Sequence, residues 1–124
     1  MAGIRSYEES DAYKLAAEAQ RLVHRAVKEP HFRTHFDLAR QILASSNSAC
    51  ANIGEGFARY RRKDHANFLR IAKASLTETI EHTKDAQSRG LVDAATANAI
   101  ASFCRRSRGA CTQWILYLEK GEGE

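Results

Sequence analysis

Four segments of the chain repeat apolar side chains at steps of three and four residues, the spacing that gives a helix one apolar face. They cover approximately residues 10–28, 35–60, 63–89 and 93–119. The stripe of the last segment is the cleanest, and it consists of Ile100, Phe103, Cys104, Ser107, Cys111, Trp114, Ile115 and Leu118. No segment alternates apolar and polar residues for long enough to indicate a strand. The pattern therefore predicts an all-α protein.

The connections between these segments carry residues that begin or end helices. Pro30, the only proline, follows the first segment, and Thr34 with Asp37 three residues later forms a weak capping box for the second. Gly90 fits a left-handed cap at the end of the third helix, and Asp93 fits the N-cap of the fourth. Because short connections make consecutive helices antiparallel neighbours, we predict a single-domain, up-and-down four-helix bundle over residues 1–124.

A run of small residues lies in the middle of the second predicted helix, over residues 45–59. Gly54 and Gly56 fall inside the helix, where each glycine costs about 0.5–1 kcal/mol relative to alanine. We expect a close approach of another backbone to offset this cost. A phosphate loop is a poor alternative, because no strand precedes the glycines and Glu55 would repel phosphate.

A polar stripe runs beside the apolar face of the same helix, at Ser45, Ser48, Asn52, Glu55 and Arg59. It has two interpretations. The stripe is either a solvated face with a Glu55–Arg59 ion pair, or a partly buried surface on which Asn52 and Glu55 bond to a neighbouring helix or subunit. We favour the second, because small neighbours bring partners close.

Two blocks of residues in the second and third helices resemble a known family. The first comprises Gln41, Ser48, residues 51–53, residues 55–57 and Arg59, and the second Phe68, Leu69, Ile71, Ala72, Ser75, Leu76 and Glu78. The family consists of four-helix-bundle proteins encoded by intervening sequences of bacterial large-subunit (23S) ribosomal RNA genes, with relatives among the accessory proteins of diversity-generating retroelements. The resemblance implies a homopentameric ring, no enzymatic activity, and association with nucleic acid or a ribonucleoprotein. It leads us to expect a helix-packing and oligomer motif at Ser48, Asn52, Gly54, Glu55, Gly56, Phe57, Arg59, Arg70, Ser75 and Glu78.

Positive charge exceeds negative charge by four, and much of it falls in three clusters. The clusters are Arg21, Arg25 and Lys28; Arg59, Arg61, Arg62 and Lys63; and Arg105, Arg106 and Arg108. Such clusters are either solvated faces with favourable charges near helix C-termini, or phosphate-binding surfaces, and the sequence weighs the two equally. A ring would repeat each patch around its axis and strengthen the field. We therefore expect a partner that is structured RNA, DNA or a ribonucleoprotein. A scaffold that binds only protein is the alternative.

The sequence shows no motif for catalysis, metal binding or base stacking. The aromatic residues mostly belong to the core stripes, and the cysteines Cys50, Cys104 and Cys111 form no CxxC pair. Glu78 and His82 are four residues apart, not the three that a di-iron bundle needs. We expect no enzyme and no cofactor. With no signal-peptide-like or membrane-spanning apolar segment in the sequence, we also expect a cytoplasmic protein with no membrane association.

Overall fold

The computed structural model describes residues 3–121, and all regular structure within them is helical. A short 3-10 helix, η1 (Tyr7–Glu9), precedes the helices α1 (Asp11–Ala26), α2 (Pro30–Arg33), α3 (Phe36–Phe57), α4 (Arg62–Ser88) and α5 (Ala94–Gly121). The all-α fold class is therefore confirmed. Residues 1–2 and 122–124 of the predicted domain lie outside the described part.

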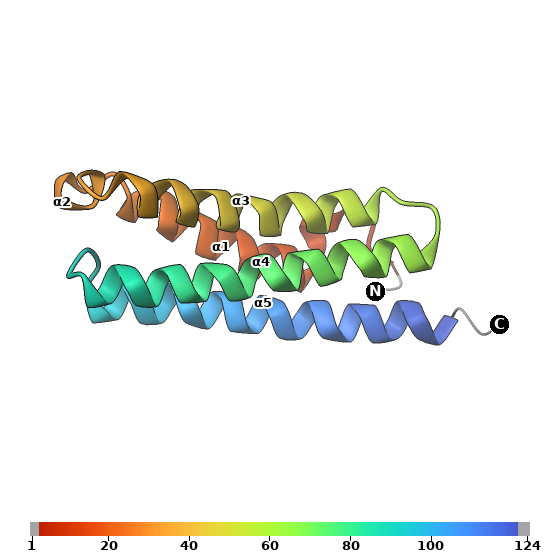
Figure 1. Ribbon diagram of the computed structural model, residues 1–124. Helices are drawn as coiled ribbons and strands as arrows, with labels where there is room; N and C mark the ends of the chain where they lie inside the picture. Colours follow the sequence, from red (N-terminus) through yellow and green to blue (C-terminus); the bar gives the residue numbers. More distant parts are fainter. Residues whose placement is uncertain (1–2, 122–124) are drawn as a thin grey trace.

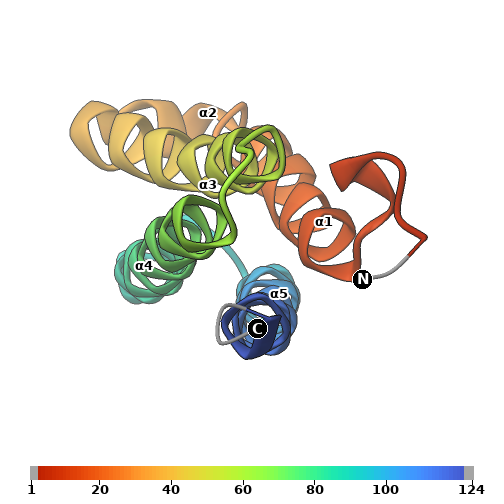
Figure 2. The same cartoon turned by 90° about the vertical axis from the view of Figure 1, so that its right-hand side faces the viewer.

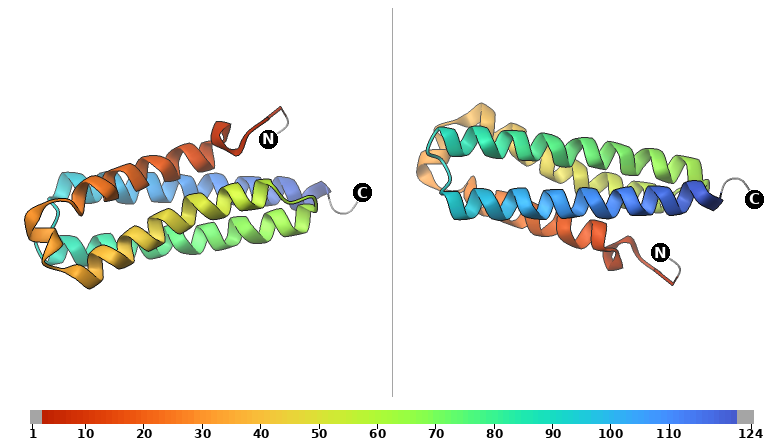
Figure 3. Two further views of the ribbon diagram at one scale, coloured as in Figure 1. Left: turned by 90° about the horizontal axis from the view of Figure 1, so that it is seen from above. Right: turned by 90° about the horizontal axis from the view of Figure 1, so that it is seen from below.

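The four long helices form an up-and-down bundle (Figure 1). Each packs on two others, so that α1, α3, α4 and α5 follow one another around the bundle in the end-on view of Figure 2. The α3–α4 turn lies at the same end as η1 and the end of α5, whereas α2 and the α4–α5 turn lie at the other end (Figure 3). This arrangement places Arg61 and Arg25 at opposite ends of the molecule.

The helix boundaries differ from the predicted ones around Pro30 and at the end of the second predicted helix, which stops at Phe57 rather than at residue 60. The first helix ends at Ala26, and Pro30 begins the one-turn helix α2, where a proline at the first position loses no hydrogen bond. Phe32 of α2 is fully buried and closes this end of the bundle.

The capping box predicted at Thr34 is wrong. The Thr34 hydroxyl donates to the His31 carbonyl at 2.8 Å, and the N-cap of α3 is His35, without a side-chain cap. Because α2 occupies residues 30–33, Thr34 serves as its C-cap instead.

The two caps predicted around the α4–α5 turn are confirmed. Gly90 has a φ of 73°, and the Gly90 and Leu91 amides donate to the carbonyls of Gln87 and Ala86, which is a Schellman motif. The Thr96 amide donates to Asp93 Oδ1 at 2.7 Å, and α5 begins directly after Asp93. This backbone bond is the main cause of the lowered pKa of Asp93.

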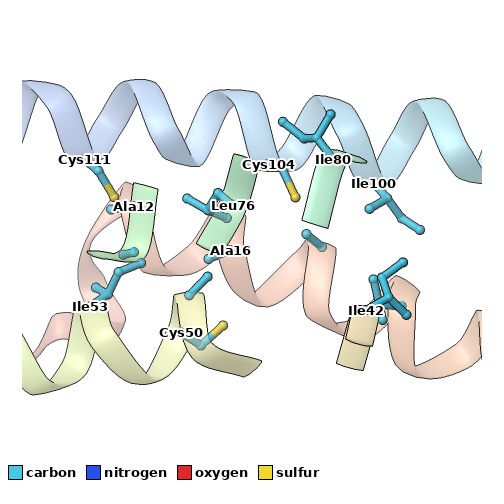
Figure 4. Close-up of a cluster of buried hydrophobic side chains, with 14 of the residues drawn as sticks. Ala12, Ala16, Ile42, Cys50, Ile53, Leu76, Ile80, Ile100, Cys104 and Cys111 are labelled. Carbon is cyan, nitrogen blue, oxygen red and sulfur yellow. The ribbon is translucent and has the colours of Figure 1, made fainter. Parts of the chain in front are cut away.

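The core combines alanines of α1 with larger apolar side chains of the other helices, and Figure 4 shows Ile100, Cys104 and Cys111 of α5 pointing into it. Several hydroxyl groups are buried among them. The Ser107 hydroxyl donates to the Ala12 carbonyl of α1 at 2.6 Å, and Thr79 bonds to both Ser45 and the Ser75 carbonyl. Buried hydroxyls with such partners avoid the cost of unmade hydrogen bonds, so the core tolerates them.

Candidate nucleic-acid interface

The small residues of α3 allow the close helix contact that the sequence predicts. A Cβ atom on Gly56 would lie 2.9 Å from Phe68 Cβ and 3.0 Å from His65 Cδ2, both on α4. A Cβ atom on Gly54 would lie 3.2 Å from the Tyr7 ring. Further along the same contact, the hydroxyls of Ser48 and Ser75 are 2.9 Å apart. The glycines therefore offset their helix cost by close packing within one chain.

The polar stripe of α3 does not bond to a neighbouring helix at Asn52 or Glu55. Asn52 is half-buried, as expected, but its Nδ2 donates to the backbone and hydroxyl oxygens of Ser48 on the same helix. Glu55 is exposed and accepts from Arg59 Nη2 at 2.7 Å. Within the described chain, Asn52 and Glu55 therefore bond only to their own helix, whereas Ser45 and Ser48 of the same stripe bond to Thr79 and Ser75 of α4. Contacts of this stripe with another subunit stay a prediction.

Three further members of the motif, Phe57, Arg70 and Glu78, make contacts within the described chain. The half-buried ring of Phe57 lies edge-on to His65 and Trp114, with centroids 6.1 Å from each. Arg70 of α4 forms an ion pair with Glu119 of α5. Glu78 is exposed, and its Oε2 lies 3.4 Å from His82 Nε2.

The structure does not bring the three basic clusters together in one chain. Arg21, Arg25 and Lys28 lie near the C-terminal end of α1, where cations interact favourably with the helix dipole. Arg21 is also paired with Glu18 at 2.9 Å. The placement of this cluster is thus explained by helix stability.

The cluster on α5 is partly engaged with its own chain. Arg108 is half-buried and its Nη1 donates to Thr77 Oγ1 of α4 at 3.0 Å. Arg106 lies 5.7 Å from the ring centroid of Phe103, and Arg105 is exposed. Two of these three arginines therefore have packing roles within the bundle.

The α3–α4 turn differs from the other two basic clusters, because three of its cations lie at the N-terminus of a helix, where positive charge is unfavourable. Arg61 is the N-cap of the 27-residue helix α4, and Arg62 and Lys63 follow in its first turn. The positive end of the helix dipole disfavours cations there, by a few tenths of a kcal/mol to about 1 kcal/mol each. Asp64 is the one carboxylate in this first turn.

The start of α4 also offers free hydrogen-bond donors. No side chain within residues 3–121 caps the helix, and its first intrahelical bond is donated by the His65 amide to the Arg61 carbonyl. Among the described residues, Arg61 and Lys63 form no ion pair, whereas Arg62 lies over Tyr117 and Arg59 over Phe68. Exposed cations beside free amides at a helix N-terminus suit the binding of phosphate oxygens.

The turn also holds an exposed aromatic residue, Tyr60, that the sequence-based prediction did not identify as part of the site. The predicted second helix runs to residue 60, which places Tyr60 at the end of a helix and gives it no role. The helix ends at Phe57, and Tyr60 is fully exposed. The signal that could have found it is the position of a tyrosine between two arginines, Arg59 and Arg61, directly before a helix start.

Burial shifts the pKa values of the three cysteines and of His65. Burial raises the pKa of Cys50 to about 11 and the pKa values of Cys104 and Cys111 to about 12, so these thiols are protonated at neutral pH. Burial also lowers the pKa of His65, and Nε2 of this ring has no hydrogen-bond partner among the described residues.

Fold and surface together define a helical bundle with a cationic turn. Within residues 3–121, no helix is long and apolar enough to cross a membrane, and no three His, Cys, Asp or Glu side chains are grouped as a metal site.

The family model described as 23S rRNA-intervening sequence protein matches residues 8–112, and the chain belongs to this family. No curated protein gives a significant match to the chain.

Proposed function

We propose that this chain is a non-catalytic, homo-oligomeric helical bundle that binds structured RNA, other nucleic acid or a ribonucleoprotein in the cytoplasm. The α3–α4 turn is its principal phosphate-binding surface. The observation that carries the proposal is the placement of Arg61, Arg62 and Lys63 at the uncapped N-terminus of α4. Their mutual repulsion and unfavourable dipole energy would be offset by bound phosphate.

Assembly into a ring, a pentamer by analogy with the family, would multiply this surface. Exposed apolar side chains on the outer faces of α4 and α5 support a subunit contact: Ile71 is 48% exposed, Leu116 55% and Tyr117 42%. Each added copy brings another α3–α4 turn, and several turns acting on one nucleic acid raise the affinity without any new type of contact.

A protein-binding scaffold is the second candidate, and one observation favours it. Phe36 is 71% exposed at the other end of the molecule, beside an open groove formed with Pro30, Ala39 and Leu43. Such a groove suits an apolar side chain of another polypeptide. On this alternative, the ring recruits a protein and makes no direct contact with nucleic acid.

The test is a titration of a structured RNA hairpin with the full chain at several salt concentrations, combined with a mass measurement of the particle. Phosphate binding predicts an affinity that falls steeply with added salt, and a particle several times the mass of one chain. If the protein binds no RNA even at low salt, the proposal is contradicted and the protein-binding scaffold remains as the candidate function. RNA binding by a particle with the mass of one chain would contradict the ring.

A further inference from the structure

Tyr60 is the one described aromatic side chain with full exposure, at 101% of its reference surface. The other aromatic residues near this end of the bundle have partners. Phe57 lies against Trp114, Phe68 lies under Arg59 at 4.6 Å, and Tyr117 lies under Arg62 at 5.6 Å. Among the aromatic residues at this end of the described chain, only Tyr60 has a fully exposed ring.

A single exposed aromatic residue is ordinary on a protein surface, so its neighbours decide what it means. Tyr60 lies between Arg59 and Arg61, and Lys63 follows three positions later. The adjoining helix start adds free backbone amides and the positive end of a dipole. An apolar protein partner would have to bury these cations unpaired, whereas a nucleotide supplies both an aromatic face and an anion.

We propose that Tyr60 stacks on the base of an unpaired nucleotide while Arg61 and Lys63 bind the phosphates on either side of it. This inference rests on the function proposed above and narrows its ligand. A paired base in a duplex is covered on both faces by its neighbours, so a ring on a protein turn reaches only a base that has left the stack. The recognised element is therefore a loop, a bulge or a single-stranded end.

The contact would favour unpaired over paired nucleotides with little base preference, because every base offers a face for stacking. Nothing in the turn provides a fixed donor and acceptor pattern for reading base edges. An unpaired nucleotide of RNA and one of DNA offer the same base for stacking. Parallel titrations with an RNA and a DNA of the same sequence show which of the two the protein binds.

The experiment compares a hairpin that has a single-stranded loop with a blunt duplex of equal length and charge, for the wild type and for variants of Tyr60. For the loop hairpin, Tyr60→Leu and Tyr60→Ala are expected to weaken binding about tenfold, whereas Tyr60→Phe and Tyr60→Trp retain it. For the duplex, all four variants bind as the wild type does. Because tyrosine is uncharged, the salt dependence stays unchanged in every variant.

Phe36→Ala is the matched control, since Phe36 is an exposed aromatic residue 5.8 Å from the guanidinium carbon of Arg40 at the opposite end of α3. It should leave the preference for the loop hairpin intact. Melting temperatures confirm folding, which the substitutions at the fully exposed Tyr60 should not disturb.

The outcomes distinguish failure of the Tyr60 stacking proposal from failure of the proposed phosphate-binding function. Equal binding of loop and duplex by the wild type, or full retention of loop binding by Tyr60→Leu, overturns the stacking proposal and leaves the phosphate-binding function in place. Loss of loop binding in Tyr60→Phe also overturns it, because phenylalanine stacks as tyrosine does. A wild type that binds neither hairpin nor duplex overturns the proposed function itself.

Discussion

Gly56 of α3 faces Phe68 of α4 so closely that a Cβ atom added to the glycine would lie 2.9 Å from the Phe68 Cβ. Real Cβ atoms essentially never approach another heavy atom this closely, so a larger residue here requires Phe68, His65 or the backbone around them to shift. Gly56 is the penultimate residue of α3 and Phe68 is the seventh residue of α4, so the contact lies close to the cationic turn that joins the two helices. Helix packing and the geometry of the turn are therefore linked at this glycine.

Gly56→Ala should destabilise the fold, although alanine is the better helix former. Overpacking lowers the free energy of unfolding by about 1–3 kcal/mol, and the better helix propensity of alanine raises it by about 0.5–1 kcal/mol. From the middle of these ranges we expect a net loss of about 1 kcal/mol. Urea denaturation measures it. Gly109→Ala is the control, because nothing lies within 4 Å of its added Cβ, and it should stabilise α5 by about 0.5–1 kcal/mol. Stabilisation by both variants would rule out the close contact.

His65 should make the bundle less stable as the pH falls below about 6.5, the usual pKa of an unfolded histidine. Burial lowers its pKa in the folded protein, so the unfolded chain binds the proton more readily. The stabilisation is complete above the unfolded pKa and is lost as the pH falls toward the folded pKa, with a slope of at most about 1.4 kcal/mol per pH unit.

Urea denaturation between pH 7.5 and pH 5 tests this dependence. His65→Leu should flatten the profile, whereas His24→Gln, at an exposed position on α1, should leave it unchanged. A wild-type profile that is already flat in this range would show that burial does not shift the pKa of His65.

The three thiols should not react in the native protein. Their raised pKa values, about 11 for Cys50 and about 12 for Cys104 and Cys111, leave almost no thiolate at pH 8. Ellman's reagent should therefore label three thiols per chain in urea and none over the same time without it. Rapid native labelling of any one of them would mean that the core opens near that cysteine.

The sequence predicts most of this fold because helical periodicity is a local property. The stripes of all four long helices, the cap at Gly90 and the cap at Asp93 depend on residues within a few positions of each other. Helix α2 was not predicted, because four residues are too few to show a helical repeat of apolar positions. The burial of Phe32 against the bundle stabilises this helix. Tertiary burial, which the sequence does not display, decides that element.

The sequence predicts the basic residues of the candidate interface but not the helix ends that position them. The cluster at Arg61, Arg62 and Lys63 can be read directly, but its meaning depends on where α3 ends and α4 begins. A shift of the helix end from residue 60 to Phe57 turns Tyr60 from a helical residue into an exposed one. In the polar stripe, Glu55 pairs with Arg59 on its own helix, whereas Ser45 and Ser48 bond to α4, a difference that the sequence spacing does not display.

The measurement that bears most directly on the account is the salt dependence of RNA binding by a charge-neutralised α3–α4 turn. The variant Arg61→Gln/Lys63→Gln is compared with the wild type and with Arg21→Gln/Arg25→Gln, which removes two cations at the other end of the molecule. Each lost phosphate contact lowers the slope of log affinity against log salt by roughly 0.7–0.9, so the turn variant should lose about 1.5 per chain. The control should keep the wild-type slope. A turn variant with an unchanged slope, or a control that loses as much, would contradict the assignment of phosphate binding to the start of α4.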